Sequence, residues 1–277
     1  MMPFGGFSHN EQTFRILTKL EHRYIKFDGL NLTWETLEGV IKHNGPLLPE
    51  MDNQSLSPTV HAFCAKWDLE LNTFAGPEAQ IASIADDIAY NTHDIDDGYR
   101  AGIFRLDDLK SLPLFGSTLI EIEREYPKAE KERLMRETVG HVIGLMVVDL
   151  LETTKTNIHN LKPKSAADIR SADHAIVGFS PTMLKHEKTL RDFLQMRMYK
   201  HSKINRACAK ARHIVKDLFN FFMIEPNCLP NAWYEVLQQQ AKDDTTKARM
   251  IADYIAGMTD RFAVQEHRRI FSTETMI

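Results

Sequence analysis

The residues best suited to chemistry lie in one short stretch, IASIADDIAYNTHDIDDGYRAG, residues 81–102. It gathers aspartates, a histidine and two tyrosines on a segment whose isoleucines recur at helical spacing. At about 100° per residue, Asp86, Tyr90 and Asp94 fall on one side of a helix and Ile88 on the opposite side. Aspartate is a poor residue inside a helix, and glutamate would solvate the same face at lower cost. One interpretation is a solvated face. The other is a lined cavity whose carboxylates hold a hard cation or accept hydrogen bonds from hydroxyl groups.

The elements that must position this stretch are helices. Gly76-Pro77-Glu78 starts the helix that carries the aspartates, with proline at the first helical position. Thr33 is placed to cap another helix from Trp34, which Asn44-Gly45-Pro46 ends. Strand-like alternation is nearly absent, so we expect an all-α protein with at most one short strand, AIVGF, at residues 175–179. The remaining helical patterns cover residues 10–24, 58–74, 117–126, 128–154, 181–222, 231–240 and 244–264, and a loop is expected at 47–57.

The composition is that of a globular protein without an obvious polyanionic partner. Of the 277 residues, 43% are hydrophobic and 26% are charged, and the net charge is −4. Neither nucleic acid nor a membrane is therefore expected as a partner. A basic cluster at residues 197–213 is typical of a solvated helix face, and nucleic-acid binding through it is a minor alternative.

The cysteines and the N-terminus point to the cytoplasm. Cys64, Cys208 and Cys228 are isolated, which argues against a disulfide framework and against a thiolate zinc site, and fits a reducing cytosol. The segment after Met1 has neither the basic region nor the apolar region of a signal peptide. No apolar run approaches the length of a transmembrane helix.

A family resemblance gives the acidic stretch a meaning. ADDIAYNTHDIDDGYRAG, residues 85–102, resembles the segment with the last metal-binding aspartate of bacterial deoxyguanosine-triphosphate triphosphohydrolases and related HD-domain dNTPases. Further matches follow in order along the chain: GGFSHNEQTFRILTKLEHRY, FDGLNLTWETLEGVIKHNGP, VGFSP, MYKH, KDLF, CLP and DYIAGMTDRFA. The resemblance implies an HD-domain-like helical bundle, incomplete at its N-terminus and with a C-terminal helical extension. Residues 1–155 would be the C-terminal part of the core and residues 156–277 a helical region packed on it.

The same resemblance assigns roles to single residues. Asp86 would be a metal ligand, and Tyr90 and Asp94 would meet the deoxyribose, with Asp94 taking the 3′-hydroxyl. His9 resembles a histidine near the scissile phosphate, where it would assist proton transfer. Its alternative is a loop histidine that caps the following helix. Lys42 could meet the triphosphate, and its alternative is a surface lysine.

One part of the family pattern is missing from this sequence. The metal site of the family uses a histidine, a His-Asp pair and the late aspartate, and the pair stands in a motif like HDxGHxPFGHxGE just ahead of GGF. Here GGF begins at Gly5, and His93-Asp94 lacks the Gly-His-x-Pro-Phe that follows the pair. We expect a divalent metal such as Mg or Mn for the full-length family member. Whether this chain retains it stays open, because the chain is expected either to start further upstream or to be a degenerate member.

Two functions follow from these observations. The first is a dNTP triphosphohydrolase, dGTP-like in its substrate, which releases a deoxynucleoside and inorganic tripolyphosphate and is inactive in the truncated form. The second is a non-catalytic helical protein that binds nucleotides or forms oligomers as a remnant of that family. Under either function, the expected partners are a dNTP and further copies of the chain.

Overall fold

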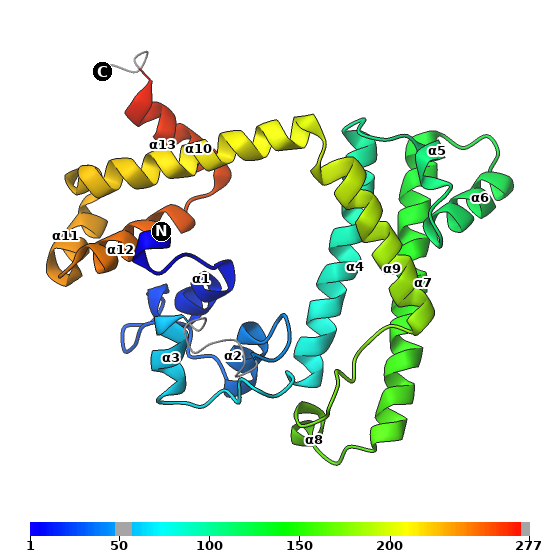
Figure 1. Cartoon of the computed structure of the whole chain (residues 1–277), viewed down its shortest axis with the longest axis horizontal. Helices are drawn as coiled ribbons and strands as arrows, with labels where there is room; N and C mark the ends of the chain where they lie inside the picture. The colour runs from blue at the N-terminus through cyan, green and yellow to red at the C-terminus, as the bar shows by residue number, and fades with distance from the viewer. Residues whose placement is uncertain (48–56, 273–277) are drawn as a thin grey trace. The chain divides into compact units, whose positions relative to one another are not determined.

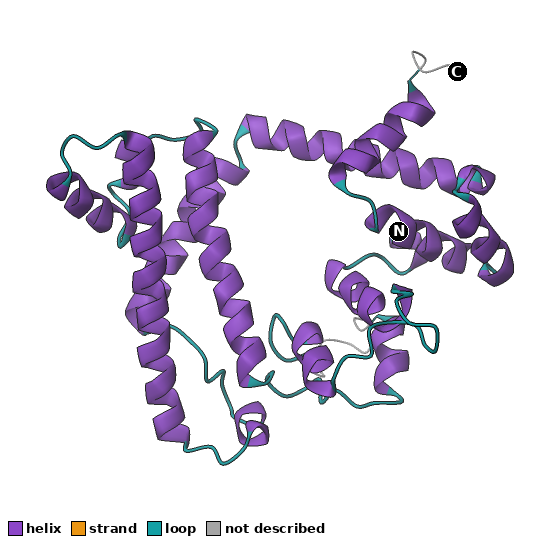
Figure 2. Ribbon diagram, turned by 180° about the vertical axis from the view of Figure 1, so that it is seen from behind, coloured by secondary structure: helices purple, strands orange, loops and turns teal. Residues whose placement is uncertain are grey.

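The computed structural model describes residues 1–47 and 57–272, and throughout these ranges the secondary structure is helical. Figure 1 labels helices α1–α13, and Figure 2 shows helices joined by loops without a strand in the described ranges. The all-α prediction is therefore confirmed. None of the helices in these ranges is both long and apolar enough to cross a membrane.

The prediction of a short strand at residues 175–179 is wrong. The backbone N–H groups of Ile176 and Val177 donate to the side-chain oxygen of Gln80, at 3.0 and 3.1 Å. Because a glutamine satisfies these donors, the extended segment needs no neighbouring strand.

Most helix bounds lie within a few residues of the sequence prediction, but the helix expected at 128–154 continues to Leu161, and the short helices Leu106–Leu109 and Ala166–Arg170 were not predicted. Three further predicted helices are shortened or interrupted. The predicted 58–74 helix ends at Cys64, and the 181–222 helix is interrupted by a π-helical turn at Gln195–Tyr199 and a bend at residue 201. The 244–264 helix is interrupted where Thr259 caps a new helix with its side chain. The loop expected at 47–57 lies largely outside the described residues. The bounds are α1 His9–Arg15, α2 Trp34–Ile41, α3 Pro58–Cys64, α4 Pro77–Arg100, α5 Leu106–Leu109, α6 Phe115–Glu125, α7 Lys131–Leu161, α8 Ala166–Arg170, α9 Pro181–Leu194, α10 Ser202–Ile224, α11 Asn231–Gln240, α12 Asp244–Ala256 and α13 Asp260–Phe271.

Both predicted helix starts are confirmed by their local geometry. The side chain of Thr33 accepts a hydrogen bond from the backbone N–H of Thr36 at 3.4 Å, which satisfies one free donor at the start of α2. Pro77 occupies the first turn of α4, where its missing N–H costs no hydrogen bond.

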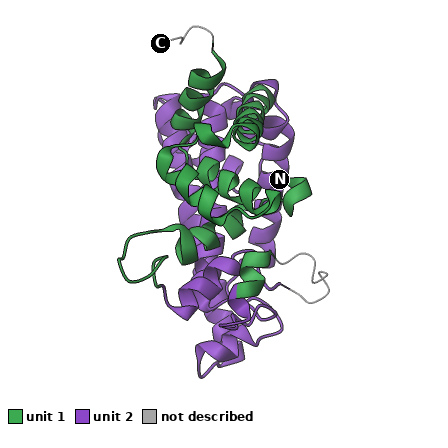
Figure 3. Ribbon diagram, turned by 90° about the vertical axis from the view of Figure 1, so that its left-hand side faces the viewer, with its two compact units in different colours: residues 1–31, 56–62, 205–277 green, residues 32–55, 63–204 purple. Residues whose placement is uncertain are grey.

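The chain forms two compact units, which Figure 3 distinguishes by colour. The larger unit, unit 2, contains residues 32–55 and 63–204, and in it α7 packs against α4 and α6 while α9 packs against α4. Its core includes the fully buried side chains of Ile95, Met135 and Leu194. Helix α2 approaches α4 closely, because a Cβ on Gly39 would lie 2.7 Å from that of Ala79.

Unit 1 contains residues 1–31, 56–62 and 205–277 and has a separate core. Phe222 and Tyr254 meet edge to face at 5.5 Å within that core, a geometry that aromatic pairs favour. The division at residue 155 that the resemblance implies concerns the roles of sequence regions and stays a prediction.

Candidate functional site

Helix α4 carries the predicted site residues on the side opposite to its buried isoleucines. Ile88 and Ile95 are buried in the core, and each contributes about 1.5–3 kcal/mol by leaving water. On the other side, the Asp86 side chain is 71% exposed and Tyr90 is 57% exposed. The helical periodicity read from the sequence is confirmed at Ile88 and Ile95, which anchor the helix, whereas Ile81 is 48% exposed.

Two tyrosines gather around Asp94 on this open side. Tyr199 donates its hydroxyl hydrogen to Asp94 Oδ2, and the rings of Tyr90 and Tyr199 lie 6.5 Å apart between centroids. Burial raises the pKa of Tyr199, and its hydrogen bond to Asp94 raises this pKa further. The phenol therefore stays a donor at neutral pH. Because a carboxylate has more acceptor positions than one hydroxyl uses, the cluster of Tyr90, Asp94 and Tyr199 can also accept a hydrogen bond from a ligand hydroxyl.

Tyr199 is a residue that the sequence prediction missed. It lies in the π-helical turn between α9 and α10, 105 residues from Asp94 along the chain. The MYKH motif that contains Tyr199 is among the family matches. That match was the only signal in the sequence that Tyr199 belongs to the site, and it did not indicate what the tyrosine does.

His43 lies beside Asp86. The Nε2 atom of His43 lies 3.8 Å from Asp86 Oδ2, and the backbone oxygen of His43 accepts a hydrogen bond from Ser83 Oγ at 2.8 Å. The loop after α2 is thus attached to the start of α4 next to the exposed carboxylate. His43 stands in the IKHNGP motif, directly after Lys42, and was also missed as a site residue.

The described residues do not complete a metal site around Asp86. In residues 1–47 and 57–272, no three histidine, cysteine, aspartate or glutamate side chains come together as a metal ion would require. Asp86 and His43 offer two donors, and transition-metal sites in proteins take three or four protein ligands.

Lys42 lies inside unit 2 and is only 1% exposed. Its ammonium group donates to Glu38 Oε1 and Thr73 Oγ1, both at 2.8 Å, and to the backbone oxygen of Phe74 at 3.4 Å. The alternative of a surface lysine is therefore wrong. Contact with a triphosphate stays a prediction, and such contact would require the ammonium group to leave at least one of three protein acceptors.

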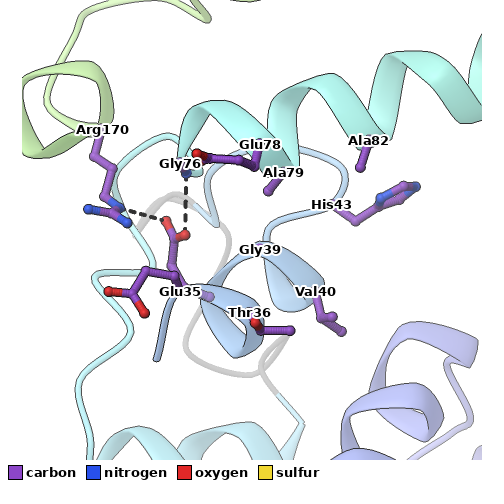
Figure 4. Close-up of a pocket in the computed structure, with 11 residues that line it drawn as sticks. Glu35, Thr36, Gly39, Val40, His43, Gly76, Glu78, Ala79, Ala82 and Arg170 are labelled. Atoms are coloured by element: carbon purple, nitrogen blue, oxygen red, sulfur yellow. Dashed lines mark hydrogen bonds and ion pairs between the residues drawn. The ribbon is translucent and has the colours of Figure 1, made fainter. Parts of the chain in front are cut away.

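A pocket of about 490 Å³ lies beside the buried pair of Lys42 and Glu38, between α2, the start of α4 and α8. Figure 4 shows Arg170 at one side of the pocket and His43 at the other end, near Ala82. Arg170 Nε lies 3.5 Å from Glu38 Oε1, and the Gly76 N–H donates to Glu38 Oε2 at 3.3 Å. The pocket thus extends from a buried ion cluster to His43, the neighbour of Asp86.

His9 belongs to unit 1 and is exposed as the first residue of α1. The cap position belongs to Ser8, and no side chain caps this helix, so the alternative of a capping histidine is wrong. The preceding loop is held to α12, because Arg249 donates to the backbone oxygen of Gly6 at 3.1 Å. The role of His9 in proton transfer stays a prediction.

The DYIAGMTDRFA segment also contributes to unit 1 through a buried ion pair. Arg15 Nε donates to Asp253 Oδ1 at 3.1 Å, and Arg15 Nη2 contacts the other oxygen of the same carboxylate. This two-pronged geometry suits a buried arginine–carboxylate pair. It joins α1, which begins at His9, to α12.

Comparison with known proteins agrees with the motifs. Residues 177–269 match the family model described as a phosphohydrolase-associated domain. The deoxyguanosinetriphosphate triphosphohydrolase-like protein of Parvibaculum lavamentivorans is 49% identical over 272 residues, which are 98% of this chain and 68% of that protein. A protein of the same name from Caulobacter sp. (strain K31) is 47% identical over 99% of this chain and 69% of its own length. The one from Caulobacter vibrioides is 47% identical over 98% of this chain and 68% of its own length. The chain belongs to the deoxyguanosinetriphosphate triphosphohydrolase-like family.

Proposed function

We propose that this protein is a dNTP triphosphohydrolase and that the exposed side of α4 binds the deoxyribose of its substrate. The observation that carries the proposal is the cluster of Tyr90, Asp94 and Tyr199, where a carboxylate and two phenols share one face with Asp86. A deoxyribose offers one apolar side and a 3′-hydroxyl. The tyrosine rings suit the first and the Asp94 carboxylate suits the second.

The proposed reaction converts a dNTP of the dGTP class and water into a deoxynucleoside and inorganic tripolyphosphate. Water adds to the α-phosphorus, the bond from phosphorus to the 5′-oxygen breaks, and the 5′-oxygen takes up a proton. The residues of this chain would orient the sugar through Asp94 and Tyr90, and His9 would carry the proton. Lys42 would meet the triphosphate if its ammonium group left a protein acceptor.

Dependence on a divalent metal such as Mg or Mn is part of the proposal, with Asp86 as one ligand. Bound metals of this kind activate water and neutralise phosphate charge. The described residues supply two of the donors that such an ion needs, Asp86 and His43.

The second candidate is nucleotide binding without turnover. It is supported by the described residues, in which no three histidine, cysteine, aspartate or glutamate side chains come together to hold a metal ion. The sugar-binding face of α4 would be the same under both candidates.

The test measures binding and turnover separately on the full 277-residue chain. Isothermal titration with dGTP reports binding, and release of tripolyphosphate in the presence of Mn reports turnover. We expect Asp94→Asn to weaken dGTP binding about tenfold, because one charge-assisted hydrogen bond is lost. The matched control is Asp87→Asn, at an exposed aspartate on the same helix about 100° from Asp86.

Each result decides between the candidates. Release of tripolyphosphate supports the hydrolase, and binding without release supports the non-catalytic candidate. If dGTP does not bind, or if Asp94→Asn binds as well as the control, the assignment of this face is wrong.

A further inference from the structure

Gly98 is a buried glycine in the interior of α4, one turn after Asp94. A glycine weakens the interior of a helix relative to alanine, so its presence here needs a reason. A Cβ at Gly98 would lie 2.5 Å from two ring atoms of Phe104 and 3.4 Å from Met198 Sδ. Packed carbon atoms keep a separation of about 3.5–4.0 Å. Gly98 is therefore the residue that lets both side chains lie against the backbone of α4.

Phe104 is also held by a helix other than α4. Its side chain is buried, and its ring meets that of Phe193 on α9 edge to face, with 5.1 Å between the centroids. Met198 is buried in the same core. A Cβ on Gly98 would therefore push Phe104 or Met198 away from α4, and with them the end of α9 and the turn that follows it.

The π-helical turn at Gln195–Tyr199 directs two consecutive side chains to α4. In an α-helix, only one of two consecutive residues points at a neighbouring helix, because the two lie about 100° apart. The wider π turn closes from residue i to residue i+5 and accommodates one residue more. Here Met198 lies at Gly98, and Tyr199 donates its hydroxyl hydrogen to Asp94 Oδ2. The seat of Met198 thus sets the position of Tyr199.

Two exposed polar contacts also hold this part of the chain. Arg197 Nη2 lies 3.2 Å from Asp108 Oδ1, and Lys203 Nζ donates to the backbone oxygen of Ala101 at 3.2 Å. Exposed contacts of this kind contribute little. The buried packing at Gly98 is therefore the main restraint on the π turn.

We propose that Gly98 is a positioning residue for the substrate site. By admitting two side chains against α4, it fixes the π turn, and the turn places Tyr199 where it holds the Asp94 carboxylate in one orientation. A carboxylate that is already held in place loses less conformational entropy when a ligand hydroxyl binds to it. The substrate role of Gly98 rests on the proposed function, because that function assigns Asp94 to the deoxyribose, whereas the placement of Tyr199 can be tested without a substrate.

The first experiment follows Tyr199 in the full chain labelled with a fluorinated tyrosine. The fluorine NMR signal of Tyr199 is identified by its absence in Tyr199→Phe, and Asp94→Asn gives the signal for the broken hydrogen bond. Gly98→Ala should move the Tyr199 signal toward its position in Asp94→Asn. The control is Gly140→Ala, at a glycine of α7 whose added Cβ meets no atom within 4 Å, and it should leave the signal unchanged. An unchanged signal in folded Gly98→Ala would overturn the proposal.

Two further variants separate displacement of Tyr199 from loss of folding. Phe104→Leu added to Gly98→Ala removes the ring atoms that the new methyl group meets. The Tyr199 signal should then return toward its wild-type position, although the core has lost a ring and stability does not rise. Met198→Ala withdraws the packing partner without adding an atom, so it should displace the signal even if Gly98→Ala does not fold. A signal that the double variant does not restore, or that Met198→Ala does not displace, would also overturn the proposal.

The second experiment connects Gly98 to the substrate. Isothermal titration with dGTP should give a dissociation constant about fivefold higher for Gly98→Ala than for wild type, because Asp94 is no longer oriented in advance. In the Tyr199→Phe background, the same substitution should have no further effect, since both changes act through one contact. Equal effects in the two backgrounds would overturn the link through Tyr199. If the wild-type chain binds no dGTP, the proposed function and the substrate role of Gly98 fail together, and the fluorine signal still decides whether Gly98 places Tyr199.

Discussion

Two groups of charges in unit 2 differ in what surrounds them. The ammonium group of Lys42 is buried and has three protein acceptors, the closest of which are Glu38 Oε1 and Thr73 Oγ1 at 2.8 Å. The carboxylate of Asp86, by contrast, is mostly in water, and His43 Nε2 lies 3.8 Å from its Oδ2 atom. Burial of a charge is costly unless the charge is paired and hydrogen-bonded. An exposed pair contributes little to stability.

This difference separates charges that hold the fold from charges that are open to a ligand. Glu38 of the buried pair accepts a hydrogen bond from the backbone N–H of Gly76, which stands at the start of α4. Among the described residues, Asp86 accepts no such hydrogen bond from a backbone N–H, although an aspartate weakens the interior of a helix. A residue that costs helix stability without a structural partner is a better candidate for ligand contact than one that is fully paired.

The largest effect should come from breaking the buried pair. Lys42→Met leaves Glu38 buried with Arg170 at 3.5 Å as its remaining cation. We expect a loss of about 3 kcal/mol in the free energy of unfolding, at the lower end for a broken buried pair because Arg170 compensates in part. Urea denaturation followed by circular dichroism measures this loss.

A double variant provides the control for this prediction. Lys42→Met with Glu38→Leu removes both charges, and replacement of a buried pair by apolar residues is often nearly neutral. Only part of the lost stability should therefore return, because Glu38→Leu also removes the carboxylate beside Arg170. If the double variant also bound dGTP normally, the predicted contact of Lys42 with the triphosphate would be wrong.

The sequence alone could predict the features of α2 and α4 that depend only on residues close together in the chain. The Gly76-Pro77 start of α4 and the opposite placement of Ile88 and Asp86 follow from helical geometry and are confirmed. The spacing of Glu38 and Lys42, four residues apart, was equally visible. Their burial was not, because it depends on how closely Gly39 lets α2 approach α4.

The missed part of the site depends on contacts that are distant in the sequence. Tyr199 reaches Asp94 because the chain departs from α-helical geometry at Gln195–Tyr199 and bends at residue 201. No proline or glycine marks this departure, so helical periodicity predicts one continuous helix across it. His43 likewise reaches Asp86 through the packing of α2 on α4.

A smaller effect should follow from removing the hydroxyl of Tyr199, which is half-buried. Tyr199→Phe deletes the hydrogen bond to Asp94. We expect a loss of about 1–2 kcal/mol in the free energy of unfolding, as for a hydrogen bond to a charged group. Tyr90→Phe is the matched control and should change stability by less than about 0.5 kcal/mol, because Tyr90 is exposed. Equal losses in both variants would contradict the assignment of Tyr199 as the residue that anchors Asp94.

Glu187 on α9 is a second buried carboxylate that can be compared with the exposed Asp86. Burial raises the pKa of Glu187 above its ordinary 4.5, while the charge of Arg191 and the hydrogen bond from Asn91 oppose the shift in part. The folded state therefore holds this proton to higher pH than the unfolded state. The resulting stabilisation is present below pH 4.5 and is lost as the pH rises through the raised pKa. In urea titrations over this range, Glu187→Gln should lack that loss, and an identical pH dependence in both proteins would contradict the prediction.

The smallest effect on stability should come from Asp86, and this near-zero effect is the informative one. Asp86→Asn removes an exposed charge that lies 3.8 Å from a histidine, so we expect a change within about 0.5 kcal/mol in the free energy of unfolding. Any effect on dGTP binding or tripolyphosphate release would then be a property of the site. A loss above about 2 kcal/mol would instead place Asp86 with the charges that hold the fold. Asp86 would then resemble Lys42 as a residue that stabilises the fold, and its presence on α4 would no longer indicate a ligand-binding site.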